Sequence, residues 1–278
     1  CVGGLPSVCV FYRSGINSIL IYFTLPFKII FFRLLMFKVI RKTPLPFLKK
    51  KEVWFADKPG LSGFLNSFYM TPKATKSILG YIKAPYFTKV IDLSAFDEVS
   101  LLASFEKNNT YKIKRAQREG VLFELEESLD LYIEYYNDFA SSKNLKKIGS
   151  ELKEFKNNLL VTKAVYENEN LVMHSYLFDD EAKRAVLFHS SSLFRNEHDS
   201  KKRSLIGRAN RFLHYQDMLY FLKRNYSIYD LGGYAYDTKD PQRVSINEFK
   251  DSFHGQLKRE NNYYPIWKYF YDKLKGLI

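Results

Sequence analysis

Cysteine is scarce in this chain. The 278 residues include two cysteines, Cys1 and Cys9, and both lie at the N-terminal end. A disulfide framework and a cysteine-rich metal site are therefore excluded, and a reducing cytoplasm is the expected location. The five histidines show no His-x-x-x-His or similar ligand spacing, so we predict no metal.

Long uninterrupted apolar runs are also missing. Residues 16 to 40 are strongly apolar, but Pro26, Lys28, Arg33 and Lys38 interrupt every run that approaches the ~20 residues of a transmembrane helix. The three cations would also lie about 140° apart around a helix axis, which excludes a clean amphipathic helix.

Acidic residues are absent from the N-terminal segment. Residues 1 to 51 contain nine Lys or Arg and no Asp or Glu, which leaves +4 of the net charge of +13 to the other 227 residues. We expect residues 1–50 to form a basic apolar segment. Two alternatives remain open for it: peripheral contact with the anionic inner face of a membrane, or a helix docked on the main domain with a basic rim.

No linker rich in Pro, Gly or Ser divides the rest of the chain. The hydrophobic content of 46% is enough for a core, and the length allows one large domain or two closely packed ones. We expect a partial subdomain at residues 51–120 and a larger domain at 121–278. The two halves should share a core, with the substrate cleft between them.

The larger half shows a regular succession of strand and helix patterns. Short polar turns join three apolar segments between residues 160 and 192, which predicts an antiparallel meander. In order, we predict strand 121–125, helices 129–142 and 150–157, strands 160–166, 171–178 and 185–192, helix 205–220, strand 227–229, a helix through 248–253 and strand 256–264. In the first half we predict strands 53–56 and 88–93, and helices near 62–68 and 96–105.

The predicted long helix bears polar residues beside its apolar stripe. Asn210 and His214 lie one turn apart, so their side chains could meet one ligand. The following strand ends at Gly232-Gly233, where a bulge, a positive φ or a close backbone approach is easiest. We expect Pro241 to close the next loop, before a helix that Ser245 or Asn247 caps.

Four groups of residues carry a family resemblance. They are the basic helix Asn108–Gly120, Ile206-Gly207-Arg208-Ala209-Asn210 with Leu213-His214, Tyr229-Asp230-Leu231-Gly232-Gly233, and Glu248-Phe249-Lys250 with Phe253 and Gly255. In order and spacing they resemble the FemAB-related branch of the GNAT acyltransferase superfamily, over about residues 50 to 270. The resemblance implies an α/β (α+β) fold with a mixed, mostly antiparallel sheet flanked by helices, and a partial GNAT-like half at the N-terminal side.

The resemblance also implies transfer of an acyl or aminoacyl group onto a primary amine. Our first expectation is an N-acyltransferase that uses acyl-CoA (acetyl-CoA) and acts on an amino sugar or another precursor of a surface polysaccharide. The alternative is a transferase that uses aminoacyl-tRNA and acts on a lipid-linked peptidoglycan precursor. The chain lacks the long helical hairpin that many cross-bridge enzymes insert, which disfavours tRNA. A non-catalytic GNAT-like module that binds a membrane or a partner is the third hypothesis.

The candidate site residues follow from these patterns and from the resemblance. His189, at the end of the third meander strand, and His214 could accept the proton of an amine, and Asp230 could orient the amine or cap a backbone turn. For the donor, the GNAT pyrophosphate loop Gln/Arg-x-x-Gly-x-Gly/Ala has its counterpart in Ser204-Leu205-Ile206-Gly207-Arg208-Ala209, with Arg203 one place early. The predicted donor-binding residues are Ser190, Ser191, Arg203, Gly207, Arg208 and Asn210.

Substrate contacts are expected on two further elements. Tyr111, Arg115 and Arg118 recur along one face of the basic helix, which could bind diphosphate or tRNA or could be a solvated surface. Lys250 and Arg243 could meet a phosphate or carboxylate. The predicted substrate-binding residues are Tyr111, Arg115, Arg118, Gly232, Gly233 and Lys250.

Overall fold

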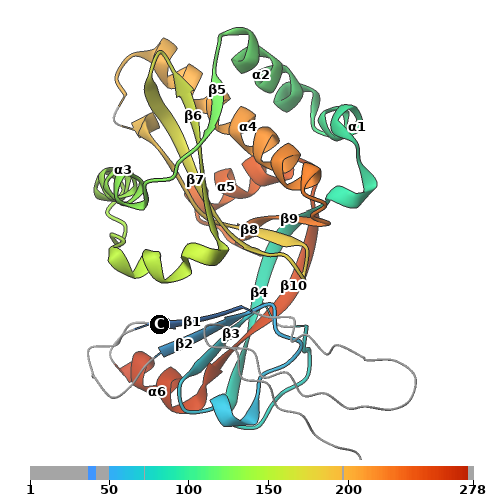
Figure 1. The fold of residues 1–278 in the computed structure, drawn as a ribbon, viewed down its shortest axis with the longest axis vertical. Coiled ribbons are helices and arrows are strands. Elements are labelled where there is room, and N and C mark those ends of the chain that lie inside the picture. The colour runs from blue at the N-terminus through green and yellow to red at the C-terminus, as the bar shows by residue number, and fades with distance from the viewer. Residues whose placement is uncertain (1–36, 42–49, 72, 196, 275–278) are drawn as a thin grey trace, which may run out of the picture. The chain divides into compact units, whose positions relative to one another are not determined.

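A ten-stranded mixed sheet runs through the described part of the chain. The computed structural model describes residues 37–41, 50–71, 73–195 and 197–274, and all of these belong to one compact unit of the chain. The strand order is β1-β2-β3-β10-β4-β9-β8-β7-β6-β5 (Figure 1). Neighbouring strands are antiparallel except for the pairs β2–β3 and β8–β9, which are parallel. The strands are β1 (Phe37–Arg41), β2 (Lys50–Trp54), β3 (Ser67–Met70), β4 (Tyr81–Asp92), β5 (Leu122–Leu125), β6 (Leu159–Tyr166), β7 (Glu169–Asp179), β8 (Arg184–Ser192), β9 (Ile228–Gly233) and β10 (Gln256–Pro265).

Helical segments cover both faces of the strands β6 to β8. The α-helices are α1 (Glu98–Ala103), α2 (Lys107–Arg118), α3 (Leu129–Ser142), α4 (Ser200–Lys223), α5 (Pro241–Asp251) and α6 (Ile266–Leu274). Four 3-10 segments are η1 (Leu61–Gly63), η2 (Leu93–Ala95), η3 (Ser150–Asn158) and η4 (Leu193–Arg195). In Figure 1, α3 and α4 lie on opposite sides of β6 and β7. Accordingly, α2 and α4 contribute to one buried apolar cluster, and α3 and η3 contribute to another.

Most of the sequence patterns of the second half are confirmed. The predicted helix 129–142 is α3, whose first turn is capped by Ser128, which accepts from the backbone N–H of Leu131. The three predicted meander strands are β6, β7 and β8, with antiparallel registers. The predicted fold, a mixed and mostly antiparallel sheet flanked by helices, is therefore confirmed.

Four local predictions are wrong. The predicted helix near 62–68 is a short 3-10 turn followed by β3, because Ser67–Met70 pairs with Lys51–Trp54 of β2. Residues 150–158 form a 3-10 segment instead of an α-helix. Pro241 begins α5 instead of closing the loop, because a proline fits the first helical position. The helix cap is Asp240, which accepts from the N–H of Gln242, and not Ser245 or Asn247 as predicted.

The last strand joins the two halves of the chain. Strand β10 lies between β3 and β4, and it pairs with β4 from Gln256 opposite Val90 to Pro265 opposite Tyr81. The predicted boundary between residues 120 and 121 falls between α2 and β5, within the single compact unit. The predicted N-terminal segment 1–50 lies outside the described residues, apart from residues 37–41 and 50.

The two glycines at the end of β9 have different roles. Gly232 has a φ of 75°, and a Cβ there would lie 2.9 Å from the carbonyl oxygen of Leu187. The register between β4 and β9 also shifts at this point, between Thr88 and Val90. At Gly233 a Cβ would meet only the ring of Tyr86, at an ordinary 3.6 Å. The predicted positive φ, bulge and close approach are thus all present, and they centre on Gly232.

We expect Gly232→Ala to lower the free energy of unfolding by about 2–4 kcal/mol, because the side chain is strained by the left-handed φ and clashes with a backbone oxygen. Gly233→Ala is the matched control, and its effect should stay within about 1 kcal/mol. Urea unfolding followed by circular dichroism measures both. Equal destabilisation of the two variants would contradict this account of the turn.

Candidate functional site

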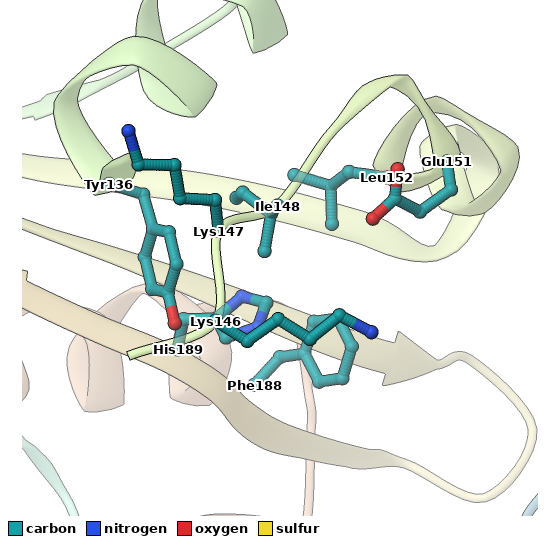
Figure 2. Close-up of a pocket in the computed structure, with 8 residues that line it drawn as sticks. All are labelled: Tyr136, Lys146, Lys147, Ile148, Glu151, Leu152, Phe188 and His189. Carbon is teal, nitrogen blue, oxygen red and sulfur yellow. The ribbon is translucent and has the colours of Figure 1, made fainter. Parts of the chain in front are cut away.

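A cavity lies beside β8, on the side of the sheet that α3 and η3 cover. Its volume is about 230 Å³. Its walls come from α3, from the segment that joins α3 to η3, from η3 itself and from β8 (Figure 2). The lining residues are Tyr136, Lys146, Lys147, Ile148, Glu151, Leu152, Phe188 and His189. We call this cavity the β8 pocket.

A β-bulge brings two consecutive residues of β8 into this pocket. The register with β7 pairs Ser175 with His189 and Tyr176 with Leu187, so Phe188 is one extra residue on β8. Side chains normally alternate between the two faces of a sheet, and a bulge breaks that alternation. Phe188 and His189 therefore both line the pocket, as Figure 2 shows.

His189 is held from several sides. Its Nδ1 lies 3.1 Å from the hydroxyl oxygen of Ser175, which in turn accepts a hydrogen bond of 3.0 Å from Tyr132. The imidazole also packs against Tyr136 and Phe188, with ring centroids 4.8 and 4.2 Å away. An imidazole held in this way is oriented before any substrate arrives. Of the predicted site residues, His189 is the one that lines the β8 pocket.

The pocket combines apolar walls with charged groups. Tyr136, Phe188 and Leu152 supply aromatic and aliphatic surface, whereas Lys146 and Lys147 bring two cations. Both lysines are exposed, as is Glu151, so the charges remain in contact with solvent. The arrangement suits a ligand with an apolar or sugar face and an anionic group.

The second predicted base, His214, is buried on the opposite face of the sheet. The sequence predicted that Asn210 and His214 contact one ligand. In the structure, both side chains contact the imidazole of His174 on β7 instead. Asn210 Oδ1 lies 2.9 Å from His174 Nε2, and the two imidazole centroids are 4.3 Å apart. Because His214 is only 1% exposed, it does not present a base to a substrate.

A chain of hydrogen bonds continues from His174. Its Nδ1 lies 2.8 Å from Asp217, and the hydroxyl of Tyr176 donates to the same carboxylate over 2.5 Å. Tyr229 lies 2.7 Å from both the hydroxyl of Tyr176 and Nδ1 of His214. Burial raises the pKa of Tyr176 and Tyr229, and burial and the neighbouring His174 lower the pKa of His214. These three side chains therefore remain uncharged and bind α4 to the sheet.

The same cluster contains the residue types that hold metal ions. The candidate ligand atoms of His174, His214 and Asp217 lie within 4.8 Å of one another. Sequence spacing missed this group because His174 comes from β7 and the other two from α4. When each ligand atom lies ~2.1 Å from a Zn²⁺ ion, two ligand atoms can be at most about 4.2 Å apart. The three side chains would therefore have to move closer together to bind a Zn²⁺ ion. The prediction that the protein has no metal stays untested.

The predicted catalytic residue Asp230 is fully buried among partners. Its carboxylate accepts from the hydroxyl of Thr88, from the guanidinium of Arg184 and, over 2.8 Å, from the backbone N–H of Gly232. Arg184 also makes a two-pronged contact with Glu260, at 2.8 and 2.9 Å. Of the two predicted roles for Asp230, capping of a backbone turn is the one that the structure shows.

Lys250 holds the glycine turn from the other side. Its ammonium donates to the carbonyls of Gly233, over 2.5 Å, and Gly232, over 3.2 Å. Burial lowers the pKa of Lys250 to about 8, against the opposing effect of the nearby Asp230. Lys250 therefore contacts backbone carbonyls instead of the phosphate or carboxylate that was predicted. Arg243, which shared that prediction, lies 3.5 Å from Asp240.

The predicted donor-binding residues do not form a helix N-terminus. Gly207 is the eighth residue of α4, so its N–H belongs to the helix interior and is not among the first four unpaired donors. The N-terminus itself is capped by Asp199, which accepts from Lys201 N over 3.0 Å, and Glu197 contacts Asp199 N over 2.8 Å. Asp199 therefore already fills the cap, and Glu197 pairs with Lys202 at 3.3 Å, so a diphosphate at that end would have to displace the Asp199 carboxylate.

The remaining candidates are spread over β8, α2 and α4. Ser191 is buried and donates to the carbonyl of Met173, and Ser190 lies beside it on β8. Arg203 packs over Phe194. Arg208 and Arg115 both pair with Glu119, at 2.7 and 2.9 Å, and so join α4 to α2.

The predicted contacts on α2 lie on its exposed face. Tyr111 and Arg118 line a shallow surface hollow together with Lys114 and Gln117. Arg115 is engaged by Glu119 instead. The hollow is a solvated basic and aromatic surface.

Comparison with known proteins gives structural resemblance alone. No protein-family model matches the sequence, and no curated protein matches it. The crystal structure of FemX superposes with a TM-score of 0.58 at 12% identity, over 84% of this chain and 85% of that chain.

Two further structures are less similar. L-PGS from Bacillus licheniformis gives a TM-score of 0.48 at 11% identity, over 82% of this chain and 83% of that chain. A GCN5-related N-acetyltransferase-like protein from Streptococcus suis gives a TM-score of 0.32 at 13% identity, over 77% of this chain and 79% of that chain. The likeness to FemX, together with the sheet order, shows that the protein has a FemX-like fold.

Proposed function

We propose that this protein transfers an acyl or aminoacyl group onto a primary amine bound in the β8 pocket. The observation that carries the proposal is the bulge at Phe188, which places His189 at the wall of a pocket of about 230 Å³ that is open to solvent on one side. An oriented imidazole at the wall of such a cavity is suited to accept a proton from a bound amine. The FemAB-like resemblance supports the same class of reaction.

The proposed reaction needs one proton acceptor. The amine nitrogen attacks the carbonyl carbon of the donor, a C–N bond forms, and the C–O bond of an ester or the C–S bond of a thioester breaks. The amine proton passes to His189 Nε2, and the departing oxygen or sulfur takes up a proton. This role requires that Nδ1–H donates to Ser175, whose hydroxyl oxygen has two lone pairs and can accept from Tyr132 as well.

The charges at the pocket favour an acceptor that carries an anionic group. Lys146 and Lys147 would attract a phosphate or carboxylate, and Glu151 would attract the ammonium form of the incoming amine. Tyr136 and Phe188 offer flat surface for a sugar ring or an aliphatic chain. An amino sugar in a phosphorylated or lipid-linked precursor fits this description.

For the donor, the occupied cap at the start of α4 favours an aminoacyl ester over acyl-CoA. Asp199 and Glu197 stand where a CoA diphosphate would meet the helix N-terminus, and Gly207 lies too far along α4 to receive it. Aminoacyl-tRNA, implied by the FemAB resemblance, does not need a diphosphate at this position. This reverses the order of the two donors that the sequence alone suggested.

We expect His189→Gln to reduce amide formation by about 100-fold or more, because the reaction loses its proton acceptor. The rate is measured with a labelled donor and an amine acceptor, and a thermal melt checks that the variant is folded. His198→Gln, at an exposed loop position, is the matched control and should keep the wild-type rate. A His189→Gln enzyme as fast as wild type would show that the histidine only packs the pocket wall.

Donor identity gives a separate prediction. A ligand at 100 times its dissociation constant stabilises a protein by about 2.7 kcal/mol, so a bound donor raises the melting temperature. We expect acetyl-CoA to leave the melting temperature unchanged. We expect aminoacyl-tRNA to serve as the donor, with a transfer rate that falls as the salt concentration rises. Asp199→Asn keeps the helix cap and removes its charge, and should leave aminoacyl transfer unchanged. A clear acetyl-CoA shift that a bulky residue at Gly207 abolishes would instead establish acyl-CoA as the donor.

A further inference from the structure

The outer face of α6 carries large apolar side chains. Ile266, Trp267, Phe270 and Tyr271 are between 36% and 54% exposed. At about 100° per residue, these four positions fall within an arc of about 140°, the width of a stripe that normally packs on a core. Single exposed apolar residues are common on protein surfaces, but a continuous stripe indicates an interaction surface.

The stripe continues onto a neighbouring loop. The backbone N–H of Ile266 donates to the carbonyl of Gly80 over 3.1 Å, and Leu79, one residue earlier, is 88% exposed. A Cβ on Gly80 would lie 3.0 Å from Cβ of Phe64, which is itself exposed. We call this surface the α6 patch; it consists of Phe64, Leu79, Ile266, Trp267, Phe270 and Tyr271.

Lysines lie near the α6 patch in the sequence. Residues 58 to 83, which include Phe64 and Leu79, contain four lysines and no Asp or Glu, and one of the four, Lys73, pairs with Asp57 just before this range. On α6, Lys268 and Lys273 lie just outside the two edges of the apolar arc, at about 200° and −20° on the same helical wheel. The ammonium of Lys268 lies 5.4 Å from the ring centroid of Tyr271. The surface is therefore an aromatic stripe with a basic rim.

We propose that the α6 patch docks the protein on an anionic lipid bilayer, with α6 lying in the plane of the interface. Trp and Tyr place their rings at the level of the lipid headgroups, and the lysines reach the anionic headgroups while their stems cover apolar surface. The charge pattern argues against a second copy as the occupant, because a two-fold symmetric contact would bring both lysine rims together. The nine residues of α6 suit a helix that lies on a membrane.

Sedimentation with vesicles tests the proposal on the full chain. We expect binding to vesicles made of equal parts of phosphatidylcholine and phosphatidylglycerol, and little binding to phosphatidylcholine alone. Trp267→Ser/Phe270→Ser should weaken binding by about tenfold or more, since two interfacial rings are lost. Val99→Ser/Leu131→Ser removes two apolar residues that are 79% and 43% exposed on α1 and α3, and is expected to bind like wild type.

Tryptophan emission supplies a second readout that does not depend on a patch variant. The chain has two tryptophans, and Trp54 is only 7% exposed, so Trp267 is the one that vesicles can reach. We expect anionic vesicles to shift the emission to shorter wavelength, and brominated lipid to quench it.

Three outcomes would overturn the proposal. One is a wild-type protein that does not sediment with anionic vesicles. Another is binding that Trp267→Ser/Phe270→Ser leaves unchanged, which would place the contact elsewhere on the chain. The third is a dimer in light scattering that this double variant dissociates, because the patch would then be an interface between copies.

Discussion

The buried carboxylate of Asp230 connects the central strands of the sheet. From β9 it reaches Thr88 on β4 and Arg184 on β8, and Arg184 extends the contact to Glu260 on β10. Removing one partner would leave a charge buried without compensation, which typically costs about 3–5 kcal/mol. Burial and the nearby Asp230 also raise the pKa of Tyr86, so a neutral phenol borders the cluster. These contacts hold β8 parallel to β9 over Arg184–Val186, directly before the bulge that forms the pocket. The position of His189 therefore depends on a carboxylate that a substrate does not reach.

Strand β7 connects two different environments through consecutive residues. His174 faces α4 and belongs to the buried hydrogen-bond chain, whereas Ser175 lies on the opposite face of the strand and contacts His189. His174, Tyr176 and Asp217 of this chain are fully buried, and burial keeps Tyr176 and His214 uncharged. A network of this kind fixes the position of α4 without taking part in proton exchange with substrate. Because the two side chains are neighbours on one strand, a shift of α4 would be transmitted to the hydroxyl that orients the pocket histidine.

Local patterns predicted much of this fold, and long-range contacts account for most of what they missed. Helix α3 and the meander strands follow from apolar periodicity and short polar turns, which neighbouring residues determine. The contact between His174 and Asp217 joins a strand to a helix that follows it in the chain, and no spacing rule relates the two. The bulge at Phe188 carries no glycine or proline to mark it. Gly207 was assigned to a helix start because the motif was matched by sequence, whereas α4 begins seven residues earlier at Ser200.

The last strand determines where the α6 patch lies relative to the rest of the sheet. Strand β10 pairs with β4 along its whole length and ends at Pro265, and α6 starts at the next residue. The hydrogen bond from Ile266 to Gly80 then ties the first turn of α6 to the start of β4. Since β4 also pairs with β9, one continuous ladder links α6 to the Asp230 cluster beside the pocket. A helix anchored in this way has little freedom to turn its aromatic face inward, so that face stays available at the surface.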